Sequence, residues 1–193
     1  MEEHHIDVEG AKIRYLEEGN GKPVIMLHGA SFTADVWAKT GTIKAISDAG
    51  WKAIAIDMPG FGKSEKGNFS SISSFLSIFV DRLKVDSFVI MGASLGGKEA
   101  LDYSTSHSER ILGLILVGAV GVWLYEERLP KLRDKPALLI WGSEDTISPK
   151  ENYETLIKYL KKSRLEIIGK IHPCYLEEPE KFNSAVVSFL KSI

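Results

Sequence analysis

The feature that most limits how this chain can fold is a series of short, continuous apolar runs, each ending near a glycine. They read "VIMLHG", "KAIAIDMPG", "SFVIMGAS", "ILGLILVGA", "ALLIWGS" and, more weakly, "RLEIIG". Continuous runs of this length are typical of strands that are buried on both faces, as in a parallel sheet. The N-terminal segments "IDVEG" and "AKIRYLEEG" instead alternate and are separated by Gly10, which predicts an antiparallel hairpin.

The segments between these runs have the spacing of amphipathic helices. Apolar residues recur at nearly i, i+3, i+4 and i+7 in residues 71–83, and related patterns predict helices over 36–49, 151–161 and 180–191. Strands and helices therefore alternate, which predicts a doubly wound, mostly parallel α/β sheet that begins with the antiparallel hairpin. Ligands of such sheets bind outside the carboxyl ends of the strands, so the loops that follow the strands are the place to look for a site.

The composition is that of an ordinary globular protein and argues against several classes of partner. Of 193 residues, 44% are hydrophobic and 26% are charged, the balance of a globular protein. The length predicts a single domain over residues 1–193, which the alternation of strands and helices makes an α/β domain. The formal net charge of -2 gives no electrostatic reason to expect nucleic acid or an anionic membrane as a partner. We expect no cofactor and no metal. The single cysteine, Cys174, and the acidic, polar start "MEEHHIDVEG" predict a cytoplasmic protein.

One of the loops, "Gly92-Ala93-Ser94-Leu95-Gly96", is a complete G-x-S-x-G between a predicted strand and a predicted helix. A chain that reverses from strand to helix within about one residue forces the serine into a strained backbone conformation. A Cβ atom at Gly92 or Gly96 would clash in so tight a turn. The serine then stands exposed at the tip, and the amide of Leu95 at the helix N-terminus points toward negative charge that develops on a substrate.

A serine hydroxyl needs a base, and the base needs an acid that orients it. Chains with this turn supply them in the order nucleophile, acid, histidine. Downstream, "WGSEDTISP" offers Asp145 and "HPCYLEEPEKF" offers His172, both directly after predicted strands. Glu144 is the alternative acid. We expect Ser94 as nucleophile, Asp145 as acid and His172 as base.

Other reactive side chains have plainer explanations. His107 falls near the end of the helix that follows Ser94 and reads as a solvated cap, and His4 and His5 lie in the N-terminal segment, where we expect no function. Cys174 is either a reactive thiol or, more in keeping with its position two residues from the base, a small hydrophobe in the core.

These motifs together resemble the α/β-hydrolase superfamily from about Val24 to Leu190. "HGASFTADVW" is similar to the family's H-G loop, "DMPGFGKS" to its D-x-P-G-x-G-x-S turn and "GASLGG" to its nucleophile elbow. "TGTIKAISDAGWKAIAIDMPGFGKSE" and "HPCYLEEPEKF" are further similar to a small cap-less subfamily, α/β-hydrolase domain-containing protein 14. That resemblance implies a small-ester hydrolase and, less directly, the removal of acetyl groups from protein lysines.

The resemblance also implies roles for the neighbouring loops. The oxyanion would be held by the amides of Leu95 and Ala30, with Ser31 as the alternative second donor. His28 is expected to be structural. Gly60 and Gly62 would shape the neighbouring turn, which Asp57 and Ser64 would hydrogen-bond internally. Family members often read G-x-G-H before the base, whereas this chain has "GKIH".

The chain also departs from most relatives in length. Only "GVWLYEERLPKLRDK" (121–135) stands where most relatives insert a helical lid, so we expect no lid and a shallow, open pocket. Trp123, Leu124 and Tyr125 either line one side of that pocket or only cap the core.

These observations favour a serine esterase that acts on a small-molecule acyl substrate through an acyl-enzyme. The alternatives are a deacylase or acyltransferase for small acyl groups such as acetyl-lysine, and a catalytically idle hydrolase fold that binds a ligand or partner.

Overall fold

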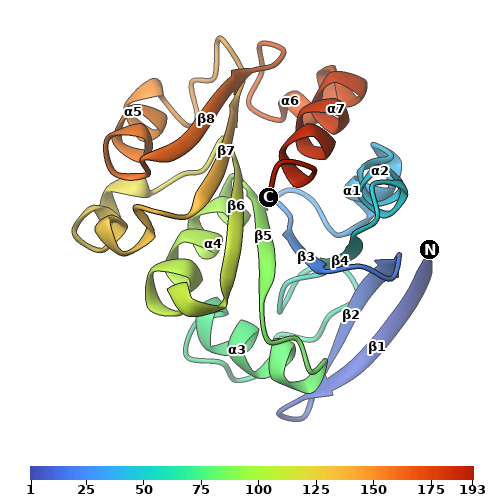
Figure 1. Ribbon diagram of the computed structural model, residues 1–193. Coiled ribbons are helices and arrows are strands. Elements are labelled where there is room, and N and C mark those ends of the chain that lie inside the picture. The colour runs from blue at the N-terminus through green and yellow to red at the C-terminus, as the bar shows by residue number, and fades with distance from the viewer.

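The strands of the protein form one eight-stranded sheet, which the computed structural model describes over residues 1–193 (Figure 1). The strand order is β1-β2-β4-β3-β5-β6-β7-β8. The strands are β1 (Glu2–Val8), β2 (Ala11–Glu18), β3 (Pro23–Leu27), β4 (Lys52–Ile56), β5 (Phe88–Ala93), β6 (Ile111–Val117), β7 (Pro136–Trp141) and β8 (Lys162–Ile167).

The first two strands form the predicted hairpin. β1 and β2 pair antiparallel with Val8 opposite Ala11, and the two residues between them, Glu9 and Gly10, both have positive φ (51° and 83°). Two-residue hairpin turns favour this conformation because its twist matches that of the strands. β2 also pairs antiparallel with β4, whereas all pairs from β4 across to β8 are parallel. The predicted mixed sheet is therefore confirmed.

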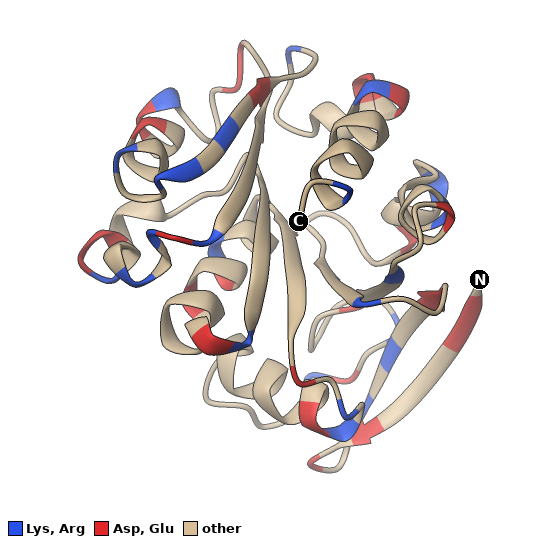
Figure 2. Cartoon of the chain, in the orientation of Figure 1, with Lys and Arg blue, Asp and Glu red and all other residues tan.

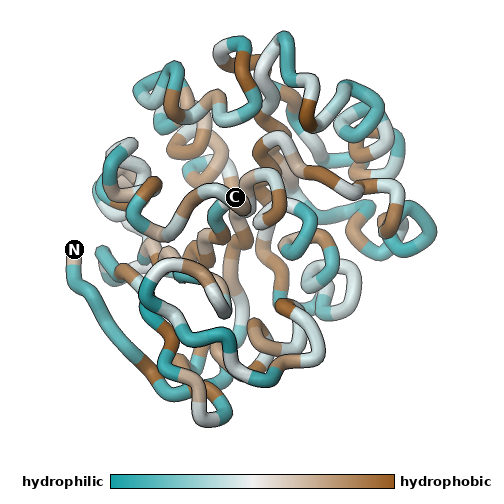
Figure 3. Tube along the Cα trace, turned by 180° about the vertical axis from the view of Figure 1, so that it is seen from behind, coloured by the Kyte–Doolittle hydropathy of each residue, from teal (hydrophilic) through white to brown (hydrophobic).

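The central strands are buried on both faces, as their continuous apolar runs predict. Every residue of β5 is buried, while β8, at the edge of the sheet, alternates between exposed and half-buried positions. One face of the sheet is covered by α3 (Ile72–Arg82), α4 (Leu95–Ser106) and α5 (Lys150–Tyr159), and the other by the first two helices together with α7 (Pro179–Leu190). In Figure 3 the hydrophobic stretches gather inside the fold and the hydrophilic ones at its margin.

The helix predicted over 36–49 is wrong as a single element. The segment forms two short helices, α1 (Asp35–Lys39) and α2 (Thr42–Asp48), separated at Gly41. Gly41 has φ 72°, the left-handed conformation that glycine adopts without a steric penalty and that ends a right-handed helix. The helices predicted over 71–83, 151–161 and 180–191 are confirmed as α3, α5 and α7. α3 begins with a capping box between Ser71 and Ser74.

No lid domain stands over the carboxyl ends of the strands. Residues 121–135 form a 3₁₀ helix, η2 (Val122–Leu132), that packs against α4 and α5 through Val122, Tyr125, Leu129 and Leu132. In Figure 2 the charged residues are interspersed on the helices and the hairpin, whereas the central strands are free of them. None of the helices is both long enough and apolar enough to span a bilayer.

Candidate active site

Ser94 occupies the single residue between β5 and α4. Its φ of 53° and ψ of -113° lie outside the regions that L-residues normally adopt. Its amide donates to the carbonyl of Val117 (2.8 Å) and its carbonyl accepts from the amide of Lys98 (3.1 Å), which starts the helix. The chain therefore reverses at Ser94 itself, and bonds on both sides fix the strained conformation.

Glycines around Ser94 are required by close backbone contacts. A Cβ on Gly92 would overlap the carbonyl of Gly96, and a Cβ on Gly96 would overlap the carbonyl oxygens of Leu27 and His28 at the end of β3. At a third glycine, Gly97, an added Cβ would lie 2.7 Å from the Cβ of Ala119. The sequence reasoning identified the first two glycines but missed Gly97, whose signal was the doubled glycine in "GASLGG".

His172 and Asp145 form a close pair. The Nδ1 of His172 lies 2.7 Å from Oδ2 of Asp145, and the Asp145 side chain is only 1% exposed. Its other oxygen, Oδ1, accepts from the amides of Ile147 (3.0 Å) and Ser148 (2.8 Å). Glu144 is instead exposed, with its carboxylate 3.6 Å from the ammonium of Lys170. The structure thus brings Asp145, not Glu144, to the histidine.

Ser94 and His172 line the same cavity of about 350 Å³. Because Nδ1 contacts Asp145, the opposite ring nitrogen, Nε2, remains; it is buried and has no hydrogen-bond partner in the protein. The walls consist of Gly29, Ala30, Ser31, Phe32, Ala93, Ser94, Val117, Ile147, His172, Pro173 and Tyr175. One cavity is therefore lined by the residues that carry a hydroxyl and an imidazole, and the imidazole contacts a buried carboxylate.

Backbone N–H groups without partners border this cavity. Ala30 and Ser31 are exposed on its wall, and neither amide donates a hydrogen bond within the chain. Leu95 is the first residue of α4, so its amide has no helical carbonyl to bond. The loop passes close to the serine, because a Cβ on Gly29 would lie 3.5 Å from the Cβ of Ser94. Ala30 and Ser31 both line the cavity with amides that make no hydrogen bond within the chain, so the structure does not distinguish between them as the second donor.

His28 is fully buried beneath this loop, and its ring nitrogens are both engaged. Nδ1 lies 2.8 Å from the carbonyl of Gly29, and Nε2 accepts from the amide of Met58 (3.1 Å). Burial lowers the pKa of His28, which keeps the ring neutral. These contacts support the structural role expected for it.

The turn "DMPGFGKS" is stabilised by hydrogen bonds within it and by hydrogen bonds to residues outside it. Asp57 accepts from the amide of Lys63 (2.9 Å), as expected, but also from the amide of Ala34 (2.8 Å). The amide of Ser64 donates to the carbonyl of Phe61 (3.0 Å) within the turn, as expected, while its hydroxyl accepts from the amide of Arg14 (2.9 Å) outside it. The buried guanidinium of Arg14 pairs with carboxylates of Glu3, Asp35 and Asp57. Arg14 was missed because its pairs join residues far apart in the chain.

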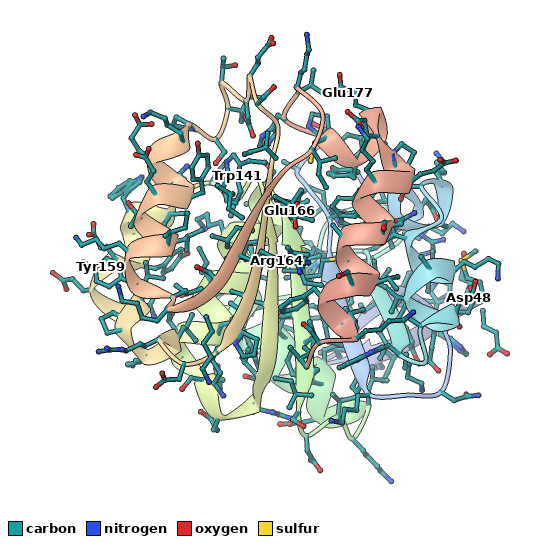
Figure 4. All side chains as sticks on the ribbon, turned by 45° about the horizontal axis from the view of Figure 1, so that its top comes forward. Asp48, Trp141, Tyr159, Arg164, Glu166 and Glu177 are labelled. Atoms are coloured by element: carbon teal, nitrogen blue, oxygen red, sulfur yellow. The ribbon has the colours of Figure 1, made fainter.

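The histidine loop is fastened by a carboxylate that the sequence did not single out. Oε2 of Glu177, in α6 (Cys174–Glu177), accepts from the amides of Lys170 (2.6 Å) and Ile171 (3.1 Å). These bonds hold the pKa of Glu177 below its usual value. Figure 4 shows Glu177 on the segment between β8 and α7 that contains α6. The acid loop is tied to the same segment, because the amide of Ser143 donates to the carbonyl of Gly169 (3.0 Å).

Gly118, directly after β6, makes room for the histidine pair. It has φ 50°, and a Cβ there would lie 3.0 Å from Cε1 of His172 and 3.1 Å from Oδ2 of Asp145. The sequence reasoning missed this residue, whose only signal was its position at the end of an apolar run.

None of the other candidate residues lines the cavity. Cys174 is buried, and burial raises the pKa of its thiol to about 12, so it packs as a small hydrophobe. His107 caps α4 and contacts the hydroxyl of Ser77 through Nε2 (3.1 Å), so it is not simply solvated. His4 and His5 lie in β1.

The segment that stands in place of a lid does not line the cavity. Trp123 is 72% exposed and Leu124 is exposed, whereas Tyr125 is buried in the core. The alternative that these residues line the pocket is therefore wrong, because η2 folds back onto α4 and α5.

Comparisons with known proteins agree with this architecture. The sequence model of a family described as "alpha/beta hydrolase fold" matches residues 22–131. The chain is 30% identical to the "Putative protein-lysine deacylase ABHD14B" of Pongo abelii, over 99% of this chain and 96% of that protein, and 30% identical to its Homo sapiens counterpart, over 97% and 94%. A crystal structure of a "predicted CIB-like hydrolase" from Thermoplasma acidophilum superposes with a TM-score of 0.93 at 30% identity, covering 100% of this chain and 98% of that one.

Proposed function

The chain belongs to the α/β-hydrolase fold family, and from this premise we propose that it is a serine hydrolase that cleaves small acyl esters. The observation that carries the proposal is the 2.7 Å contact between Asp145 and His172, whose free Nε2 shares a cavity with the strained Ser94. A module that only binds a ligand has no need of this set, which argues against an idle fold.

Acylation follows from the roles that these positions support. Nε2 of His172 removes the proton of the Ser94 hydroxyl as Oγ attacks the acyl carbonyl carbon. Asp145 orients the ring and stabilises the imidazolium that forms. The amide of Leu95, with that of Ala30 or Ser31, donates to the developing oxyanion. His172 then returns its proton to the leaving alkoxide, and an acyl-serine remains.

Deacylation repeats these steps with water as the nucleophile. His172 takes a proton from the water as its oxygen attacks the acyl carbonyl, and it returns the proton to Oγ of Ser94. The products are a carboxylic acid and the free enzyme. An amine or a thiol in place of water would turn the same intermediate toward acyl transfer.

The size of the cavity supports a small acyl group. About 350 Å³ lies at the lower end of the ~300–1,000 Å³ typical of small-molecule sites. Each methylene that leaves water contributes about 0.8 kcal/mol, but only where a wall covers it. With no lid above the site, added methylenes beyond the first few carbons gain little.

Removal of acetyl groups from lysine is the second candidate function. It is favoured by the similarity to the ABHD14B proteins, which are described as protein-lysine deacylases. A site without a lid can admit a lysine side chain that projects from another protein. The same triad would act, with an amine as the leaving group.

A series of p-nitrophenyl esters tests the proposal. We expect kcat/KM to be highest from acetyl to butyryl, to fall or flatten by octanoyl, and to show no interfacial activation, since no lid has to open. A fluorophosphonate should label the wild-type protein but not Ser94→Ala. A steady rise through octanoyl would contradict the small-acyl proposal, and an unlabelled wild-type protein would contradict a serine hydrolase.

A further inference from the structure

The wall of the cavity beside Ser94 carries no lysine, arginine, aspartate or glutamate. Its polar side chains are those of Ser31, Ser94, His172 and Tyr175. Burial raises the pKa of the Tyr175 phenol, so that group stays neutral. The remaining residues of the wall are apolar or glycine, and Phe32 and Ile147 are the bulkiest of them.

The cations nearest to the site in sequence are already paired with carboxylates. Lys170, two residues before His172, lies 3.6 Å from Glu144, and Lys150, three residues after Ile147, lies 3.2 Å from Glu154. Lys98, one turn into α4 from Ser94, lies 2.8 Å from Glu99. The charge that reaches the wall is negative, because Asp145 is buried directly behind the His172 ring. A carboxylate in the cavity would therefore find no cationic side chain and would face an existing anion.

The remaining groups that could bind an anion are backbone N–H groups, which carry only a partial positive charge. In the proposed mechanism they already bind the substrate. The N–H groups of Leu95 and of Ala30 or Ser31 must receive the carbonyl oxygen of the scissile ester. A second carboxylate on the acyl chain could bond to them only by displacing that oxygen, which gives an unproductive complex. Left elsewhere in the cavity, it would be desolvated without a partner, which is strongly unfavourable.

We infer that the acyl groups this site transfers are neutral as well as short: acetyl, propionyl, butyryl and their branched analogues are substrates, and dicarboxylic acyl groups such as malonyl and succinyl are excluded. This inference rests on the proposed function, and it adds a chemical class to the limit on size.

Two ethyl esters of the same shape separate charge from size. Ethyl 3-methylbutanoate and monoethyl malonate have the same number of non-hydrogen atoms in the acyl group, and two methyl groups in one stand where two carboxylate oxygens stand in the other. Hydrolysis is followed by NMR at pH 8, and each kcat/KM is divided by the rate of that ester with hydroxide to remove differences in intrinsic reactivity. We expect the corrected value for the malonate to be about 100-fold lower.

A cation placed on the rim should reduce this discrimination. Ile147 lines the cavity and is 63% exposed, so a longer side chain there can extend without entering the core. In Ile147→Arg we expect the ratio between the two esters to shrink about tenfold, because a guanidinium can pair with the carboxylate. The matched variant Ile147→Gln is polar and carries no charge, and it should keep the wild-type ratio.

The outcomes distinguish this inference from the proposed function. Similar corrected rates for the two esters would overturn the inference alone, and so would a ratio that Ile147→Arg leaves unchanged. If p-nitrophenyl acetate is hydrolysed but neither ethyl ester is, the cavity does not accept a neutral chain of this size and the inference also fails. Absence of turnover with p-nitrophenyl acetate itself would overturn the proposed function.

Discussion

Replacing Gly118 by alanine tests how firmly the His172–Asp145 pair is held. The backbone at Gly118 has φ 50°, a conformation that costs an L-residue roughly 1–2 kcal/mol. The new Cβ would also lie 3.0–3.1 Å from Cε1 and Nδ1 of His172 and from Oδ2 of Asp145. Such crowding adds about 1 kcal/mol or more, because Asp145 is itself fixed by the amides of Ile147 and Ser148 and His172 is fixed by its bond to Asp145.

Gly50→Ala provides the matched control. Gly50 has φ 85°, but a Cβ there meets nothing within 4 Å, so the variant carries the backbone strain without the crowding. We expect the Gly50 variant to lose about 1 kcal/mol of unfolding free energy and the Gly118 variant about 2–3 kcal/mol. For a chain of this length, each kcal/mol lowers Tm by roughly 2–4 °C.

Activity should separate the two variants more clearly than stability does. A displacement of His172 by about 1 Å can lower turnover by about 100-fold. We therefore expect kcat with p-nitrophenyl acetate to fall by about 10- to 100-fold in Gly118→Ala and to change less than about twofold in Gly50→Ala. Tm is measured by circular dichroism on the same samples. Equal turnover in the two variants would refute the view that Gly118 fixes the position of the pair.

Three further predictions follow from other parts of the site. Ser94→Ala and His172→Ala should each lower kcat by orders of magnitude, and the double variant should be scarcely worse than either, because the two act as a unit; additive losses would contradict their joint role. Glu177→Ala should lower Tm at pH 7 and lower it less at pH 3. The pKa of Glu177 is depressed in the folded protein, so the stability it contributes is present above its usual value of 4.5 and is lost as the pH falls through the lowered folded value; a deficit that does not shrink on acidification would count against the carboxylate. Cys174 should resist thiol reagents at pH 8 in the native protein and react after unfolding, because it is buried and its pKa is about 12; rapid labelling of the folded protein would show that this segment opens.

Local patterns predicted the strands, the hairpin and the serine turn because the requirements of these elements are local. A strand buried on both faces needs a continuous apolar run, and β5 has one in which every residue is buried. A reversal within one residue needs small neighbours, and Gly92 and Gly96 stand where any Cβ would meet backbone. The same reasoning failed for 36–49, since the apolar spacing continues across Gly41 although the left-handed backbone there ends the helix.

The sequence by itself thus determined the order of strands and helices and placed Ser94, Asp145 and His172 on loops at one edge of the sheet. Only the tertiary structure decided which groups surround them. Gly118 leaves room for the ring of His172, which follows a different strand, and the side chain of Asp57 accepts from the amide of Ala34 in a different loop. Tyr125 turned into the core rather than toward the cavity. Periodicity along the chain records which face of an element is apolar, whereas these contacts depend on how separate elements pack, and that is fixed only when the whole sheet has formed.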